Sequence, residues 1–116
     1  MAQATERLAV ARESLEAGHP TVAVSVAYYA MLNAARAALS EDDEQARTHG
    51  GTWNLFRRRY VVTDAFDQHL FARAHQAREA REQGDYEAIS HSEETARALV
   101  ESAGEFIAAV ARMIGD

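Results

Sequence analysis

Residues 20–39, with the sequence PTVAVSVAYYAMLNAARAAL, constrain the fold of this chain more than any other stretch. No charged residue occurs there before Arg36, and apolar or small side chains would surround a helix on nearly every side. Such a helix is normally buried, because it has no face for water to solvate. Its length also suits a membrane span, but Ser25, Asn33, Arg36 and the many alanines argue against one. We therefore expect the core helix of a small soluble bundle and no membrane contact.

The composition favours an all-α fold. Alanine is abundant, proline occurs once, and runs of β-branched residues are few. The chain is long enough to bury a core, so we expect one domain over residues 1–116. It contains no cysteine, and its first residues mix charged with apolar side chains instead of forming a secretory signal. Both features fit the cytoplasm.

Interruptions of the apolar periodicity predict an up-and-down bundle of four long helices and one short helix. The first long helix is expected at about 5–17, the second at 20–39, and Gly18 and Pro20 mark the boundary between them. A glycine turn at 48–52 precedes a short helix at 53–60. Thr63 or Asp64 should cap the third long helix, which runs to about residue 83. Gly84 should end it, and the last helix is expected at 86–113 with Asp85 as its cap and Ile89 on its apolar seam.

The charge is unevenly distributed. The net charge of −6 argues against nonspecific binding of nucleic acid by the whole surface. Residues 47–81, however, carry seven arginines and three acidic residues, which leaves a charge of −10 on the remainder. The run Arg57, Arg58 and Arg59 is the best electrostatic candidate for contact with a phosphate group or a partner protein, although a solvated helix face also explains it. All twelve basic residues are arginine, which a GC-rich genome explains as well as phosphate recognition does.

Three segments, in the same order, resemble the small single-domain HEPN proteins of bacteria and archaea. They are AYYAMLNAAR at 27–36, THGG at 48–51 with a Leu-Phe pair at 55–56, and AREQGDY at 80–86. The resemblance covers essentially the whole chain. It implies a helical bundle that forms a homodimer. It also implies pairing with a minimal nucleotidyltransferase in a toxin–antitoxin arrangement.

The same resemblance implies a possible catalytic site, with one departure. Active members of the wider family cut RNA without a metal through an Arg-x4–6-His motif, and the matching arginine here is Arg81. Tyr86 stands where the histidine would be. Histidine, with a pKa near 6.5, can exchange a proton at neutral pH, whereas tyrosine near 10 stays protonated. We therefore expect binding in preference to catalysis, with Tyr86 donating a hydrogen bond or stacking on a base.

The remaining candidate residues have both a structural and a functional interpretation. Tyr28 and Tyr29 can pack within the bundle, or together with Asn33 they can face Arg81 or a second protomer. His49 can stabilise the turn at 48–52 or supply a catalytic imidazole. The residues that can form either an ion-pair set or part of an RNA contact are Arg78, Arg81 and Asp85.

No metal or cofactor is expected. His69 and His75 are six residues apart, so they do not share a helix face as a zinc-binding pair would. A short basic recognition helix for sequence-specific DNA binding is also absent from the sequence.

Three functions remain open at this point. One is a dimeric module that docks on a nucleotidyltransferase and acts through binding of a partner, a nucleotide or RNA. The second is a metal-independent endoribonuclease toxin that uses Arg81 with Tyr86 or His49. The third is a bundle that binds a nucleotide or another ligand between two protomers.

Overall fold

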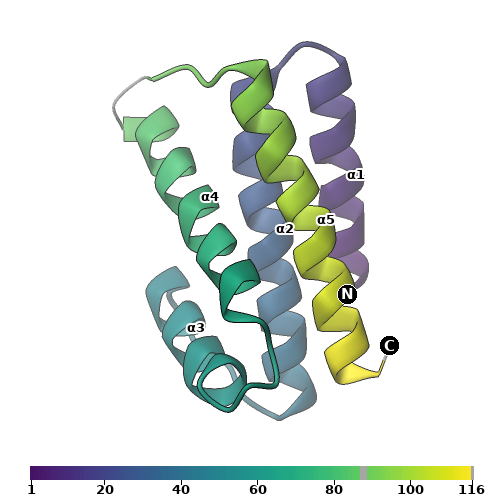
Figure 1. Cartoon of the computed structure of the whole chain (residues 1–116), viewed down its shortest axis with the longest axis vertical. Helices are drawn as coiled ribbons and strands as arrows, with labels where there is room; N and C mark the ends of the chain where they lie inside the picture. The colour runs from purple at the N-terminus through teal and green to yellow at the C-terminus, as the bar shows by residue number, and fades with distance from the viewer. Residues whose placement is uncertain (87–88, 116) are drawn as a thin grey trace.

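The computed structural model describes residues 1–86 and 89–115, without the side chain of Tyr86, and this part of the chain is an all-α bundle (Figure 1). Four long helices run up and down beside one another, which confirms the expected fold class. A short α-helix and a π-helix connect the second long helix to the third. The helices are α1 (Ala2–Glu16), α2 (Pro20–Glu41), α3 (His49–Phe56), the π-helix η1 (Arg57–Val61), α4 (Gln68–Tyr86) and α5 (Glu93–Ile114).

Helix α2 lies at the centre of the bundle and contacts α1, α3, α4 and α5. Within the described part of the chain it is the one helix long and apolar enough to cross a membrane, but 61% of its apolar window is buried inside the protein. Burial in the bundle therefore accounts for its apolar composition, as the sequence predicted. Many of its buried side chains are alanines, which allow neighbouring helices to approach closely: Ala23, Ala27, Ala30, Ala34, Ala35 and Ala38.

The connection between α1 and α2 has the predicted form. Gly18 adopts a left-handed backbone with φ of 83°, which glycine tolerates without a steric cost. Pro20 is the first residue of α2, where its missing N–H costs no hydrogen bond. The short connection makes the two helices antiparallel, and α1 buries one stripe that consists of Ala4, Leu8, Ala11 and Leu15.

The predicted glycine turn at 48–52 is wrong, because these residues form the start of α3. Thr48 is the N-cap, and its Oγ1 accepts a hydrogen bond from the Gly51 amide at 2.9 Å. Its carbonyl oxygen also accepts one from the Thr52 hydroxyl at 2.9 Å. These bonds satisfy groups that a helix end otherwise leaves unpaired, and they offset the low helix propensity of two glycines. His49 therefore lies on a helix and not in a turn.

The segment between α3 and α4 also differs from the prediction. The helix widens at η1, where the Tyr60 hydroxyl contacts the Ala38 carbonyl oxygen at 2.9 Å. Thr63 and Asp64 do not cap α4: Asp64 adopts a left-handed backbone with φ of 63° and belongs to the connection. Helix α4 begins at Gln68, after Asp67 has accepted a hydrogen bond from the His69 amide at 2.6 Å.

Helix α4 also ends later than predicted, and α5 begins later. Gly84 and Asp85 lie inside α4, and Ser92 caps α5 by accepting a hydrogen bond from the Thr95 amide at 3.1 Å. A Cβ on Gly84 would lie 3.4 Å from both His91 Nε2 and Thr21 Cγ2, so this glycine allows a close approach and does not stop a helix. Ile89 is 43% exposed and precedes α5, so it is not part of the seam.

The core combines the α5 seam with a group of aromatic rings. The seam of α5 consists of buried residues at helical spacing: Ala96, Leu99, Ala103, Phe106 and Val110. The Trp53 ring of α3 lies with its centroid 6.2 Å from that of Phe56, 6.1 Å from Phe71 and 5.9 Å from Phe106. These contacts hold α3 against the long helices and fix its N-terminal residue, His49, over α2.

Candidate functional site

Tyr28 connects α2 to α3 in the interior of the bundle. Its side chain is fully buried. The indole Nε1 of Trp53 donates to the Tyr28 hydroxyl oxygen at 3.1 Å, and the same oxygen lies 3.1 Å from Nδ1 of His49. Burial raises the pKa of Tyr28, so the hydroxyl stays protonated at neutral pH. Tyr28 is therefore a neutral hydrogen-bonding group that orients the His49 ring.

Arg81 of α4 lies over the same part of α2. Its guanidinium carbon is 5.6 Å from the ring centroid of Tyr28 and 5.1 Å from that of Tyr29. These are cation–π distances, and such contacts stabilise a desolvated cation by roughly 0.5–2 kcal/mol. The imidazole of His49 lies 5.7 Å from both rings. We call Tyr28, Tyr29, His49 and Arg81 the Arg81 cluster.

The guanidinium of Arg81 is only partly neutralised. Its side chain is 15% exposed, and it pairs with Asp85 one turn later, Nη2 to Oδ2 at 3.3 Å. Its Nε is buried and has no acceptor among the described residues. An unpaired buried donor costs about 1–3 kcal/mol, so this N–H offsets stabilisation from the cation–π contacts. The exposed 15% leaves part of the Arg81 side chain accessible to solvent.

The arginines around His49 change its acid–base behaviour. Partial burial lowers the pKa of His49 from 6.5, and the positive charges of Arg36, Arg81 and Arg78 lower it further. The imidazole is therefore neutral at pH 7. If Nδ1 donates to Tyr28, Nε2 can accept a proton; if Tyr28 donates to Nδ1, Nε2 carries a hydrogen and can donate to an anion.

Arg78 lies on α4 one turn before Arg81. Its Nε is 3.4 Å from Glu82 Oε1, and its side chain is partly buried. The guanidinium lies against α3, where a Cβ on Gly50 would be 3.8 Å from its Nη2. The expected ion-pair set is thus divided into two pairs, Arg78 with Glu82 and Arg81 with Asp85. Both arginines remain close enough to His49 to lower its pKa.

Other predicted binding residues lie outside the Arg81 cluster. Arg57, Arg58 and Arg59 are exposed on η1, and Arg59 pairs with Glu44 at 3.1 Å. Asn33 is one turn beyond Tyr29 on α2, beside a hollow that Arg36 also lines. The side chain of Tyr86, the predicted hydrogen-bond donor, lies outside the described part of the structure.

No set of three histidine, aspartate and glutamate side chains in the described residues is arranged to hold a metal ion. His91, a further histidine of the chain, makes contacts that join parts of the fold. Its amide donates to Thr21 Oγ1 at 3.0 Å, and its Nε2 lies 2.7 Å from the Ala80 carbonyl oxygen. These bonds fasten the chain after α4 to α2 and to the turn that carries Arg81.

Sequence reasoning missed the contributions of Trp53 and Arg36. Nothing in the sequence marks Trp53 as part of a site, yet it donates the hydrogen bond that fixes Tyr28. Arg36 was noted within a motif without a role, yet it is the largest charge effect on His49. The spacing of Tyr29, Asn33 and Arg36 by four and three residues, which places them on one face of a helix, was the available signal for Arg36.

Fold and site together define a class: an all-α bundle protein with a cationic cluster between its second and fourth α-helices. The sequence profile of the HEPN domain matches residues 1–113. The chain therefore belongs to the HEPN family and is a small HEPN-domain protein. A comparison with curated proteins gives no match.

Proposed function

We propose that this HEPN protein binds a phosphate group of RNA or of a nucleotide at the Arg81 cluster and acts by binding rather than by catalysis. The observation that carries the proposal is the state of Arg81. It is desolvated, held over two tyrosine rings and left with an unpaired Nε. Guanidinium groups bind phosphate oxygens with a fork of N–H donors, and a partly buried cation binds them more strongly than an exposed one does.

Electrostatics support an anionic ligand at this place. Arg36, Arg78 and Arg81 all act on His49, although the chain as a whole has a net charge of −6. Glu82 and Asp85 pair with two of these arginines but do not remove their combined effect on the imidazole. A phosphate group would gain from this local positive potential, and the acidic remainder of the surface would disfavour nonspecific binding elsewhere.

A metal-independent endoribonuclease is the second candidate, and His49 is the observation that favours it. A neutral imidazole at pH 7 can accept the proton of a ribose 2′-hydroxyl, while Arg81 would bind the scissile phosphate. Tyr86 would assist as a hydrogen-bond donor. Binding is preferred because the motif position holds Tyr86, and tyrosine, with an ordinary pKa near 10, is a poor base at neutral pH. Burial raises the pKa of Tyr28, which makes this residue unsuitable as a base as well.

Binding and cleavage of labelled single-stranded RNA in EDTA test the two candidates together. For the binding proposal, Arg81→Ala should weaken binding by about tenfold or more, because hydrogen bonds to charged groups contribute about 1.5–3 kcal/mol. Arg112→Ala, which removes an exposed arginine on α5, is the matched control and should change affinity little. No cleavage is expected from the wild type.

Cleavage in EDTA that disappears in His49→Gln would replace the binding proposal with the endoribonuclease. Tyr86→Phe then shows whether the phenol takes part. Equal RNA affinity in wild type, Arg81→Ala and Arg112→Ala would contradict a site at the Arg81 cluster.

We also propose that the protein is a homodimer that docks on a nucleotidyltransferase of a toxin–antitoxin-like system. The support is the family membership and the surface of α1 and α2. Val10 and Val22 are exposed there, and a hollow lined by Arg7, Val10 and Val26 lies between the two helices. Co-expression with a nucleotidyltransferase encoded beside the gene, followed by co-purification, tests the partner.

A further inference from the structure

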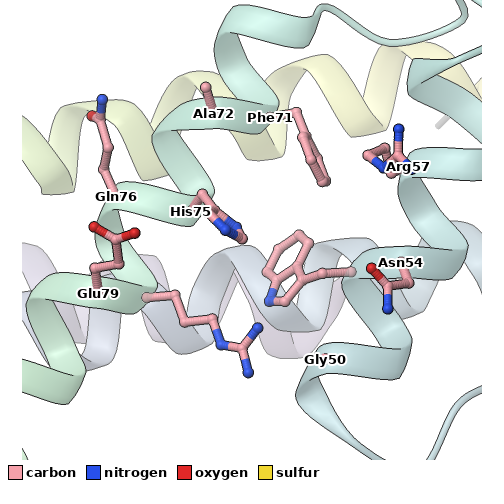
Figure 2. Close-up of a pocket in the computed structure, with 10 residues that line it drawn as sticks. Gly50, Asn54, Arg57, Phe71, Ala72, His75, Gln76 and Glu79 are labelled. Atoms are coloured by element: carbon pink, nitrogen blue, oxygen red, sulfur yellow. The ribbon is translucent and has the colours of Figure 1, made fainter.

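A cleft of about 530 Å³ opens between α3 and α4, next to the Arg81 cluster (Figure 2). We call it the α3–α4 cleft. Its volume falls in the range of small-molecule sites, which is about 300–1,000 Å³. Neither the sequence motifs nor the proposed phosphate site accounts for it.

The walls of the α3–α4 cleft are aromatic and apolar. Trp53 from α3 and Phe71 from α4 meet with their ring planes at 70° and their centroids 6.1 Å apart, so they form a corner. Ala72 contributes a small side chain on the α4 side, where His75 also lines the cleft. Trp53 is only 4% exposed and forms the floor of the corner, so a flat aromatic group would stack on the partly exposed ring of Phe71.

The rim of the cleft is polar and positively charged. Asn54 and Gln76 supply side-chain amides, each with donors and an acceptor. Arg57 and Arg78 border the cleft, whereas Glu79 is the one carboxylate among its lining residues. Amides suit the donor and acceptor groups on the edge of a nucleobase, and the arginines suit a phosphate attached to it.

The cleft and the Arg81 cluster share residues. Arg78 lines the cleft and also lowers the pKa of His49, and Gly50 in the cleft wall directly follows His49. Trp53 forms another part of that wall and donates its N–H to Tyr28 of the cluster. A ligand that extends from one region to the other therefore carries an anionic group joined to a flat aromatic one.

We propose that the α3–α4 cleft binds the base of the nucleotide whose phosphate lies at the Arg81 cluster. This inference rests on the proposed function and adds a base-binding subsite to it. Stacking on an aromatic side chain contributes about 1–3 kcal/mol per base, which corresponds to roughly 5- to 150-fold in affinity. The subsite would thus set both affinity and preference among nucleotides.

Calorimetric titration with AMP and with ribose 5-phosphate measures the contribution of the base, because the two probes share the sugar and phosphate. AMP should bind at least about fivefold more tightly. Trp53 is the only tryptophan of the chain, so AMP should also quench the intrinsic tryptophan fluorescence more than ribose 5-phosphate does.

A cleft-filling variant locates the base. Ala72→Leu should reduce the AMP affinity to that of ribose 5-phosphate and leave the latter unchanged. Ala108→Leu is the matched control, because Ala108 is an exposed alanine on α5, away from the cleft-lining residues. Gln76→Ala, which shortens a rim side chain, gives a second variant and should weaken AMP binding alone. Circular dichroism checks that all three variants are folded.

Two results would overturn the inference while the proposed function stands, and a third would overturn both. Equal affinity for AMP and ribose 5-phosphate leaves the phosphate site standing but removes the base subsite. Unchanged AMP binding in both Ala72→Leu and Gln76→Ala places the base elsewhere. If neither probe nor RNA binds the wild type, the phosphate site itself is wrong and the base subsite falls with it.

Discussion

Tyr28 shows how one buried hydroxyl can join the core to a surface site. Its oxygen receives the Trp53 N–H and contacts the His49 ring, and its ring supports Arg81. The neighbouring Tyr29 has similar ring contacts with Arg81 and His49 but is only half-buried. The two tyrosines therefore form a matched pair in which the buried hydroxyl is the main difference.

Tyr28→Phe should destabilise the protein by about 1–3 kcal/mol, because the buried Trp53 N–H loses its acceptor. Tyr29→Phe should cost clearly less. Chemical denaturation followed by Trp53 fluorescence measures both variants. Equal effects of the two substitutions would contradict the role given to the Tyr28 hydroxyl.

His49 should make stability depend on pH. Burial and the nearby arginines lower its folded-state pKa from the ordinary 6.5, so the unfolded chain binds more protons just below pH 6.5. The stability that neutral His49 contributes to the folded protein is therefore fully present above about pH 6.5, its ordinary pKa. It is lost as the pH falls through the lower pKa that His49 has in the folded state. In His49→Gln this part of the slope should disappear, as urea unfolding between pH 7.5 and 5 would show. A slope unchanged by the substitution would mean that His49 titrates as in the unfolded chain.

The residues of the candidate site were only partly predictable from sequence. The motif resemblance identified Arg81, His49 and the two tyrosines as candidates, and the structure brings them together. The bond from Trp53 to Tyr28 joins residues that are 25 positions apart on different helices. Such a contact depends on how α3 packs, and periodicity describes only which face of one helix is apolar.

Helix α3 illustrates how capping can override propensity. Two glycines in a row favour a turn, but Thr48 caps the helix and its Oγ1 occupies the space beside Gly51. Gly50 has no such neighbour. The same pair of residues thus contains one glycine that the structure requires and one that it tolerates.

Alanine substitutions of these glycines should have opposite signs. Gly50→Ala should stabilise the protein by up to about 1 kcal/mol through helix propensity, since the nearest atom would lie 3.8 Å from the new Cβ. Gly51→Ala places its Cβ 2.9 Å from Thr48 Oγ1 and should cost about 0.5–2 kcal/mol through loss of the cap. Thermal unfolding of the two variants gives the comparison, and a stabilised Gly51→Ala would show that the cap is dispensable.

Helix existence was easier to predict than helix ends. The long apolar stretch of α2 and the seam of α5 determine a helix over many turns, and both were identified correctly. The sequence predicts that Gly84 ends α4, but its small size instead allows a close approach of His91 and Thr21. The end of α4 depends on that tertiary contact, which the local sequence does not contain.

The bundle exposes an apolar strip on α1 and α2 that its own core leaves uncovered. Val10 is 42% exposed and Val22 is 53% exposed, and Val26 lies one turn beyond Val22. Under the proposal of a homodimer, this strip is the surface that a second copy would cover. The three valines would then provide the apolar centre of the interface.

Val10→Glu should convert the proposed dimer to a monomer, because it places a charge in the centre of the interface. Val62→Glu is the matched control, since Val62 is 62% exposed in the connection after η1. Light scattering coupled to size-exclusion chromatography measures both variants. A wild-type protein that is monomeric at high concentration would contradict the dimer itself.

The alanines that line α2 also determine which mutations this protein can tolerate. In most cores, removing methyl groups is the damaging change, because it leaves cavities. Around Ala27, Ala34 and Ala35, which are fully buried, there are few methyl groups to remove and no exposed space for added ones. Substitutions that enlarge these side chains should therefore be the most destabilising, each lowering the free energy of unfolding by about 1–3 kcal/mol. Saturation mutagenesis of α2 would then show a loss of stability that rises with side-chain volume at these three positions. Family members should accordingly carry glycine, alanine or serine at them.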